Sequence, residues 1–207
     1  MNTSMNNPRQ KLKQMIEQFA LFVNYDQQYE LASGSKSHYI FNVKNVCFND
    51  GSVLLADALL DILNREEFDY ITGMEVGAIP IVQAVCIRSR LNSVKKPIDG
   101  FFVRKKEKTR GTKNKIDGLW HEKEKLPNSK IIVLDDVTTS GESVLTVVRD
   151  LRLLNCKIEK VITVIDRLEG AKETLKHENV KLIPLFTIED FNIPTEEEWR
   201  KSPEKWL

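Results

Sequence analysis

The sequence predicts an α/β protein in which a central, mostly parallel sheet is flanked by helices. Almost wholly apolar segments of strand length alternate with segments whose apolar residues repeat at helical spacing. Strands that are apolar throughout are typical of parallel sheets with helices on both faces. Three polar or glycine-containing segments directly follow predicted strands, and the carboxyl ends of parallel strands meet at one edge. We therefore expect one shared binding site at that edge.

The first half of the chain is predicted to begin with a helix, because Pro8 suits a first helical turn. Its apolar stripe comprises Leu12, Met15, Ile16, Phe19 and Val23. A strand is expected at residues 39–46, where β-branched and aromatic residues alternate with others. Further along, we expect a helix at 53–63 with Ser52 as its candidate N-cap, a strand at 70–72 ending at Gly73, and a helix at 79–88.

The second half is predicted to continue the alternation. Strands are expected at residues 101–103, 131–134, 161–165 and 181–186. Helices are expected at residues 144–154 and 169–176. Residues 194–207, which include Trp199 and Trp206, are read as a tail that packs on the body as a helix.

The overall composition indicates one globular domain. The 207 residues suffice for one sizeable α/β domain and are few for two. Hydrophobic residues make up 41% and charged residues 29%, and a net charge of +1 gives no global attraction to nucleic acid or membrane. No apolar run reaches the roughly 18 residues of a membrane span, and the polar first residues show no secretory signal.

The cysteines and histidines carry little functional signal. Three cysteines, odd in number and widely spaced, read as reduced structural thiols, so we expect a cytoplasmic protein. The three histidines lack the spacing of metal ligands, and a zinc site is not expected.

The stretch 131–143 is the most informative part of the chain. Four apolar residues lead to two adjacent carboxylates, and small or hydroxyl residues then precede a helix beginning near Val144: Asp135, Asp136, Val137, Thr138, Thr139, Ser140, Gly141, Glu142 and Ser143. Carboxylates accept hydrogen bonds from sugar hydroxyls, and backbone N–H groups at a helix N-terminus bind phosphate. This order favours a ribose 5-phosphate site over a metal site or a plain structural turn. A P-loop is excluded because G-x-x-x-x-G-K-[ST] is absent.

Residues 104–115 form a basic segment with seven basic residues and one acidic residue in twelve positions. It is read as a solvated loop, a nucleic-acid surface, or a mobile lid over a pyrophosphate leaving group. The segment lacks the aromatic residues that stack on bases. Fixed cationic groups stabilise the charge that develops on departing pyrophosphate, and a lid excludes water, so we favour the third interpretation.

These two segments resemble known motifs. Residues 131–143 resemble the phosphoribosyl-pyrophosphate (PRPP) loop of type I phosphoribosyltransferases, and residues 102–118 resemble the catalytic loop of orotate phosphoribosyltransferases, R-K-x-x-K-[DE]-[HY]-G-T-x-x-x-[IL]-[ED]-G. The resemblance implies that Arg104, Lys105 and Lys108 contact pyrophosphate, often from the neighbouring subunit. Arg110 stands where the family usually has His or Tyr, and it keeps a donor and adds charge.

Three further segments resemble the same family. Residues 33–41 are similar to S-G-x-K-S-P-x-Y-x, which implies that Ile40 and Phe41 line the base pocket; Ala32 stands where some members have a lysine that contacts PRPP. Residues 73–80 are similar to the pyrophosphate loop, here Glu75, Val76 and Gly77, with Gly77 replacing a lysine found in part of the family.

The third of these segments, residues 165–170, is similar to D-R-x-E-G. This similarity implies that Arg167 binds the carboxylate of orotate, for which a guanidinium fork is well suited. The alternative is a surface arginine at a helix start. Thr139 would give the base a hydroxyl partner.

Taken together, the resemblance implies a type I phosphoribosyltransferase fold with a small N-terminal hood and a flexible basic lid. The chain is expected to be a single domain, 1–207, with a hood at about 1–50, a core at about 51–190 and a tail at about 191–207. The implied reaction joins orotate to PRPP, giving orotidine 5′-monophosphate and pyrophosphate in pyrimidine synthesis. Mg²⁺ would be carried by PRPP, with Asp135 and Asp136 acting through water.

The resemblance also implies a homodimer whose lids act in trans, with neither nucleic acid nor membrane as a partner. One alternative is a phosphoribosyltransferase of the same fold that takes a purine, which Arg167 disfavours because purines lack a carboxylate. Another is a PRPP-sensing regulator. The small net charge and the short region before the first strand disfavour a DNA-binding protein.

Overall fold

The core of the computed structural model is a five-stranded sheet in the order β11-β10-β9-β5-β6, in which all neighbouring strands run parallel. The structure describes residues 7–31, 34–91, 96–105, 115–119 and 123–206. The strands of this sheet are β5 (Tyr70–Thr72), β6 (Asp99–Gly100), β9 (Lys130–Thr138), β10 (Lys157–Asp166) and β11 (Lys181–Thr187). The predicted α/β class with a central parallel sheet is confirmed.

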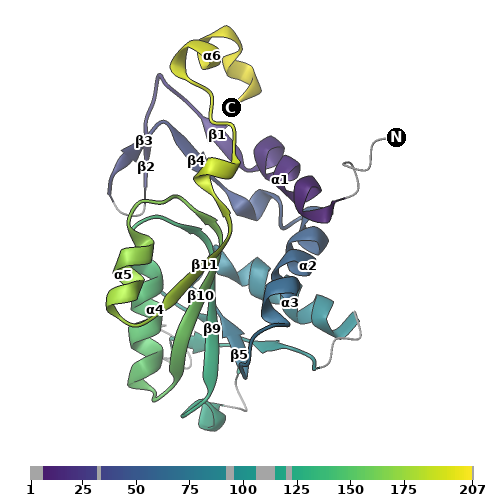
Figure 1. Ribbon diagram of the computed structural model, residues 1–207, viewed down its shortest axis with the longest axis vertical. Coiled ribbons are helices and arrows are strands. Elements are labelled where there is room, and N and C mark those ends of the chain that lie inside the picture. Colours follow the sequence, from purple (N-terminus) through teal and green to yellow (C-terminus); the bar gives the residue numbers. More distant parts are fainter. Residues whose placement is uncertain (1–6, 32–33, 92–95, 106–114, 120–122, 207) are drawn as a thin grey trace.

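Helices cover both faces of this sheet (Figure 1). They are α2 (Gly51–Leu63) and α3 (Ala78–Leu91) on one face, and α4 (Glu142–Leu153) and α5 (Ala171–His177) on the other. Side chains of β9 alternate between the two cores: Ile132 and Leu134 pack with α2 and α3, whereas Ile131 and Val133 pack with α4. This double burial explains why the strands are apolar throughout.

The N-terminal segment lies beyond one end of the sheet in Figure 1, and we call residues 7–50 the hood. Its elements are α1 (Pro8–Phe19), β1 (Leu21–Val23), β2 (Tyr29–Glu30), β3 (Lys36–Ser37), β4 (Tyr39–Phe41) and a 3₁₀ turn, η2 (Val43–Asn45). Strand β1 pairs antiparallel with β4, and β2 pairs antiparallel with β3. The hood therefore adds two small sheets above the carboxyl ends of the core strands.

The remaining elements are a hairpin beside the sheet and a C-terminal helix on the hood. They are β7 (Phe102–Val103), β8 (Ile116–Asp117), the 3₁₀ turns η3 (Lys123–Lys125), η4 (Ile188–Asp190) and η5 (Pro203–Lys205), and α6 (Glu196–Lys201). Trp199 of α6 is buried, and its Nε1 donates to the carbonyl oxygen of Val23 at 2.9 Å. Tyr25 Oη donates to the carbonyl oxygen of Pro194 at 2.9 Å. The tail does form a helix that packs on the body.

Several predicted boundaries in the hood are wrong. Val23 belongs to a strand, because α1 ends at Phe19 and β1 then pairs with β4. The strand predicted over residues 39–46 ends at Phe41, and the chain continues as a 3₁₀ turn. Phe41, Val43 and Val46 are all buried, so the apolar pattern reflects one packed side of a turn.

The predicted N-cap of α2 is also wrong. Ser52 lies inside the first turn, and Asp50 occupies the cap position without a side-chain cap bond. Asn49 Oδ1 instead accepts a hydrogen bond from the backbone N–H of Gly51 at 2.9 Å. An Asx turn thus replaces the expected cap.

Two further strand predictions need correction. Strand β9 does not end at the acidic pair but continues through Asp135 and Asp136 to Thr138, because β10 supplies pairing partners that far. Of the strand predicted at residues 101–103, only β7 (102–103) is observed, and it pairs with β8; the edge strand of the central sheet, β6, ends earlier, at Gly100. The predicted helices over 79–88, 144–154 and 169–176 correspond to α3, α4 and α5 with shifted ends.

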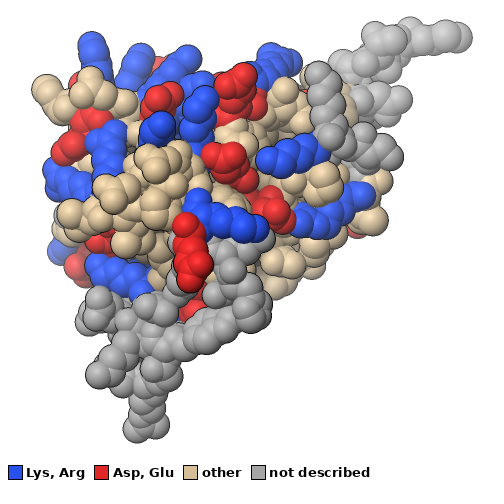
Figure 2. All heavy atoms as spheres, turned by 90° about the horizontal axis from the view of Figure 1, so that it is seen from below, with Lys and Arg blue, Asp and Glu red and all other residues tan. Residues whose placement is uncertain are grey.

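The end of the molecule opposite the hood carries charges of both signs. Figure 2 shows basic and acidic side chains interspersed there. Ion pairs link neighbouring elements, for example Lys130 with Glu67 at 3.2 Å and Arg152 with Glu178 at 3.5 Å. Within the described residues, no helix is both long enough and apolar enough to cross a membrane.

Candidate active site

A cavity of about 560 Å³ lies between the carboxyl end of β9, the start of α4 and the hood strand β4. This volume is within the range of small-molecule sites. Its lining residues are Glu30, Leu31, Ile40, Phe41, Asp135, Asp136, Val137, Thr138, Thr139, Ser140, Gly141, Glu142, Ser143, Val144 and Arg167. The ribose-phosphate segment and the base residues expected from the sequence therefore share one cavity.

Two carboxylates form the acidic part of the cavity. Asp135 and Asp136 are both half-buried, and Thr138 Oγ1 lies 2.7 Å from Asp135 Oδ2 and 2.9 Å from Thr163 Oγ1. Burial, reinforced by the charge of Asp136, raises the pKa of Asp135 to about 7. Burial also raises the pKa of Asp136, and the nearby Lys44 charge opposes that shift. Such a pair is stabilised by hydroxyl donors or by a cation.

The bend after β9 exposes backbone N–H groups. Val137 and Thr138 belong to the strand, so the open bend begins at Thr139 and ends where α4 starts at Glu142. Gly141 has φ +85°, and a Cβ there would lie 3.2 Å from the Cα of Ala171. Only glycine suits this conformation and this close approach. The first N–H groups of α4 lack intrahelical partners and, with the helix dipole, favour an anion.

Arg167 lines the cavity and contacts the hood. The residue is 5% exposed, and its guanidinium lies 4.3 Å from the ring centroid of Tyr39. Nε donates to Glu169 Oε1 at 2.7 Å, Nη1 to the carbonyl oxygen of Tyr39 at 3.2 Å, and Nη2 to Ser37 Oγ at 3.0 Å. These contacts use three of five N–H groups and fix the orientation of the fork. Arg167 is therefore not a free surface arginine.

The loop after β5 reaches the acidic pair through Gly77. A Cβ on Gly77 would lie 2.2 Å from Asp136 Oδ2, so any side chain in this backbone position would collide with the carboxylate. The loop and the carboxyl end of β9 are thus in direct contact. Glu75 and Val76, from the same loop, do not line the cavity, and Val76 is 65% exposed.

Arg104 and Lys105 follow β7 and lie outside the cavity lining. Arg104 is paired with two carboxylates, those of Asp117 and Glu75. Three residues singled out from the sequence lie outside the described part of the chain: Ala32, Lys108 and Arg110.

Sequence reasoning missed several residues that support this site. Lys44, whose charge acts on Asp136, carries no motif and is brought near by the η2 turn. Ser37 and Tyr39 accept hydrogen bonds from Arg167. Both lie in the segment 33–41, in which the resemblance gave a role only to Ile40 and Phe41. Asp117 belongs to the quoted catalytic-loop pattern, and its acidic character could have identified it as a partner of Arg104.

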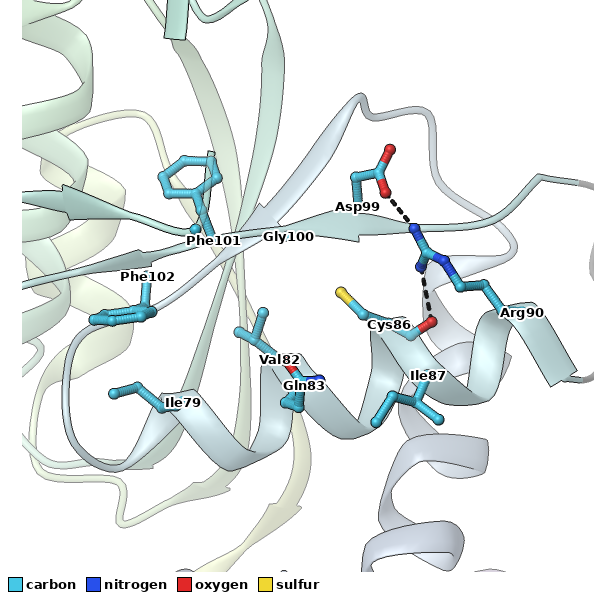
Figure 3. Close-up of a pocket in the computed structure, with 11 residues that line it drawn as sticks. Ile79, Val82, Gln83, Cys86, Ile87, Arg90, Asp99, Gly100, Phe101 and Phe102 are labelled. Atoms are coloured by element: carbon cyan, nitrogen blue, oxygen red, sulfur yellow. Dashed lines mark hydrogen bonds and ion pairs between the residues drawn. The ribbon is translucent and has the colours of Figure 1, made fainter. Parts of the chain in front are cut away.

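A second cavity of about 420 Å³ lies on the outer side of α3 (Figure 3). Side chains of α3 such as Ile79, Val82 and Cys86 face Phe102 and the edge strand β6 across it. Its charged residues are paired with each other, because Arg90 binds Asp99. The two charged residues of this groove therefore face each other, whereas the first cavity brings an acidic pair and an arginine together.

Known protein families and sequences match this chain over most of its length. Residues 43–198 match the phosphoribosyl transferase domain family. The chain is 40% identical over 163 residues to the orotate phosphoribosyltransferase of Methanocaldococcus jannaschii, which covers 79% of this chain and 86% of that protein.

Solved structures resemble the fold closely. The orotate phosphoribosyltransferase of Mycobacterium tuberculosis H37Rv in complex with Fe(III) dicitrate has a TM-score of 0.73 at 23% identity, covering 90% of this chain and 100% of that one. The same mycobacterial enzyme in complex with PRPP has a TM-score of 0.69 at 22% identity, covering 89% and 98%. At these identities the likeness concerns the fold alone.

The raised pKa of Asp135 makes stability depend on pH. Between an ordinary carboxyl pKa near 4 and the value of about 7, the folded protein holds a proton that the unfolded chain releases. Stability is therefore lost as the pH rises through this window. We expect Asp135→Asn not to lose this stability. Between pH 5 and pH 8, the difference in unfolding free energy between Asp135→Asn and the wild type should shift by about 2–4 kcal/mol in favour of the variant.

Urea denaturation of both proteins at the two pH values measures this difference. Asp50→Asn, which changes an exposed carboxylate, is the control and should follow the wild type. A gap between Asp135→Asn and the wild type that stays constant with pH would contradict the assignment.

Proposed function

The chain belongs to the orotate phosphoribosyltransferase family, and we propose that its residues divide the two substrates between the ends of the first cavity. The enzyme transfers the phosphoribosyl group of PRPP to orotate, which gives orotidine 5′-monophosphate and pyrophosphate. The observation that carries the assignment of residues is the cavity that joins an acidic pair, an open N–H bend and a fixed arginine.

Asp135 and Asp136 accept hydrogen bonds from the ribose hydroxyls in this proposal. The N–H groups of residues 139–143 bind the 5′-phosphate. Support comes from the half-buried carboxylates and from the positive φ of Gly141 at the start of α4. As the bond from C1 to pyrophosphate breaks, the sugar gains positive charge, which nearby carboxylates stabilise. The residues act by position and charge, and no side-chain nucleophile is required.

The same acidic pair fits Mg²⁺. Carboxylate and phosphate oxygens are the ligands that this ion prefers, and a cation would offset the burial that raises the pKa of both side chains and the charge of Asp136 that adds to the shift at Asp135. Among the described residues, no group of three or more His, Cys, Asp or Glu could hold a metal ion. We therefore propose that Mg²⁺ arrives with PRPP and that Asp135 and Asp136 hold its waters. When bound, the ion neutralises charge on the leaving pyrophosphate.

Pyrophosphate is assigned to the basic segment and to the loop after β5. Arg104, Lys105 and Lys108 would contact its oxygens, and Arg110 would add a further donor. Of these residues, Arg104 and Lys105 are described, and both contact Glu75. The loop of Glu75, Val76 and Gly77 would border the same oxygens. The contact between Gly77 and Asp136 supports this placement, because it joins the loop to the ribose end of the cavity.

Orotate is assigned to the hood side. Arg167 binds its carboxylate, since two N–H groups of the fork remain beyond its three described hydrogen bonds. Ile40 and Phe41 pack on the ring, and the Thr139 hydroxyl bonds the base. All of these residues line the first cavity. A purine has no carboxylate for Arg167.

We further propose a cytoplasmic homodimer in which the lid of one subunit serves the site of the other. The three cysteines are free thiols, which suits a reducing compartment. Ile87 lines the groove in Figure 3 and is 49% exposed, and Leu91, the last residue of α3, is 71% exposed. This helix directly follows the pyrophosphate loop. A second copy on this face would therefore lie next to the site.

A direct assay tests the base assignment. Purified protein is mixed with PRPP, Mg²⁺ and single bases, and the ultraviolet absorbance of orotate is followed. We expect consumption of orotate and not of hypoxanthine or xanthine. Turnover of a purine alone would reject the assignment, and tight PRPP binding without turnover of any base would favour a regulator.

Arg167→Ala should impair orotate capture much more than PRPP capture. Losing a charged hydrogen-bond donor typically costs about 1.5–3 kcal/mol, so we expect kcat/KM for orotate to fall about 10- to 100-fold. The KM for PRPP should change little, because the side chain of Arg167 extends to the hood, where it bonds Ser37 and Tyr39. Arg149→Ala, which removes an exposed arginine of α4, is the control. Equal losses for both substrates would refute the role.

Subunit mixing tests catalysis in trans. Lys108→Ala and Asp136→Asn proteins should each be nearly inactive. If the lid serves the neighbouring subunit, each mixed dimer has one intact site, and equal mixing should restore about a quarter of wild-type activity. Mixing should restore nothing if each lid covers its own site or if the protein is monomeric.

A further inference from the structure

Arg104 is held by two carboxylates from different parts of the chain. Its Nε donates to Asp117 Oδ2 at 2.6 Å, and its Nη1 donates to Glu75 Oε2 at 3.3 Å. Asp117 lies on β8, in the same hairpin as Arg104, whereas Glu75 comes from the loop after β5. All three side chains are about three-quarters buried, with 26%, 20% and 24% exposure for Arg104, Asp117 and Glu75.

Glu75 also reaches the next basic residue. Its Oε1 accepts a hydrogen bond from the backbone N–H of Lys105 at 3.0 Å. The backbone positions the carboxylate, because the N–H of Glu75 donates to the carbonyl oxygen of Val103 at 2.9 Å and Met74 forms a parallel bridge with Val103. The carboxylate of Glu75 thus accepts hydrogen bonds from both the side chain of Arg104 and the main chain of Lys105.

Both described ion-pair partners of Arg104 are carboxylates. One guanidinium faces two carboxylates, at the place where the proposed function puts a polyanion. The contact to Asp117 is short and made through Nε, so it can orient Arg104 by itself. The contact to Glu75 is longer and uses the Nη1 end, which a pyrophosphate oxygen could take over.

We propose that Glu75 is a positioning residue that occupies Arg104 and Lys105 in place of pyrophosphate and thereby sets the affinity for PRPP and for pyrophosphate. This inference rests on the proposed function, because it takes Arg104 as a pyrophosphate contact. Bound pyrophosphate replaces Glu75 on both donors, and Glu75 recovers them when pyrophosphate leaves. Asp117 keeps Arg104 in place throughout the exchange. The carboxylate therefore weakens the binding of donor and product while keeping the donors ordered.

A purely structural role for Glu75 predicts the opposite effect of its removal on PRPP affinity. If Glu75 only supported Arg104, its removal would disorder Arg104 and weaken PRPP binding. If it competes with pyrophosphate, neutralising it without changing its shape strengthens binding, because one negative charge leaves the neighbourhood of a polyanion. Glu75→Gln provides this change, since the amide oxygen can still accept from Lys105.

The test compares Glu75→Gln with Asp117→Asn, the matched loss of the other carboxylate. We expect Glu75→Gln to lower both the KM for PRPP and the inhibition constant of sodium pyrophosphate by about 3- to 10-fold at low salt, with the KM for orotate unchanged. The gain should shrink at high ionic strength. Asp117→Asn should raise the KM for PRPP instead. Glu75→Asp, which keeps the charge, should not show the gain.

A double mutant separates this inference from the proposed role of Arg104. Arg104→Gln alone should raise the KM for PRPP, and in that background Glu75→Gln should lose most of its gain. An unchanged KM in Arg104→Gln would overturn the pyrophosphate role of Arg104 itself. If Arg104→Gln behaves as expected but Glu75→Gln, with a wild-type thermal midpoint, leaves pyrophosphate inhibition unchanged or weaker, the competition is refuted. Calorimetric titration of sodium pyrophosphate measures the same affinities without turnover.

Discussion

The structure depends most on two adjacent carboxylates that the central strand β9 carries into a half-buried position. Because β10 pairs with β9 beyond the acidic pair, Asp135 and Asp136 cannot move apart to relieve their repulsion. The surroundings are built around this constraint: the hydroxyl of Thr138 bonds Asp135, Lys44 opposes the charge of Asp136, and Gly77 lets a loop approach without a side chain. The hydroxyl groups and the cation of the proposed ligand would offset the cost of this buried charge.

The other groups of the site are arranged around the acidic pair according to their charge. The acidic pair, the bend of residues 139–143 and Arg167 line one cavity. Arg104 and Lys105 are the described residues of the basic segment that contact Glu75. Each proposed ligand group meets its complement: hydroxyls meet carboxylates, phosphate meets N–H groups, and a carboxylate meets a guanidinium. Catalysis by position and electrostatics needs only that these groups stay fixed. Hydrogen bonds to Ser37 and Tyr39 fix Arg167 in this way.

The parallel sheet and its helices could be predicted because strands that are buried on both faces are apolar throughout, and because the helices repeat apolar residues at helical spacing. Local motifs predicted the shared cavity of Asp135, Gly141 and Arg167. The end of β9 was misjudged, since pairing with β10 decides it and charged residues alone suggest a terminus. Lys44 and the pairing of Glu75 with Arg104 were not predicted, because each depends on how distant loops meet in three dimensions.

The most direct test of the central claim is a crystal structure of the protein soaked with PRPP and Mg²⁺. The account predicts ribose hydroxyls within hydrogen-bond distance of Asp135 and Asp136, with the 5′-phosphate on the N–H groups of residues 139–143. Density for PRPP at any other place, with the acidic pair bound only to solvent, would contradict it.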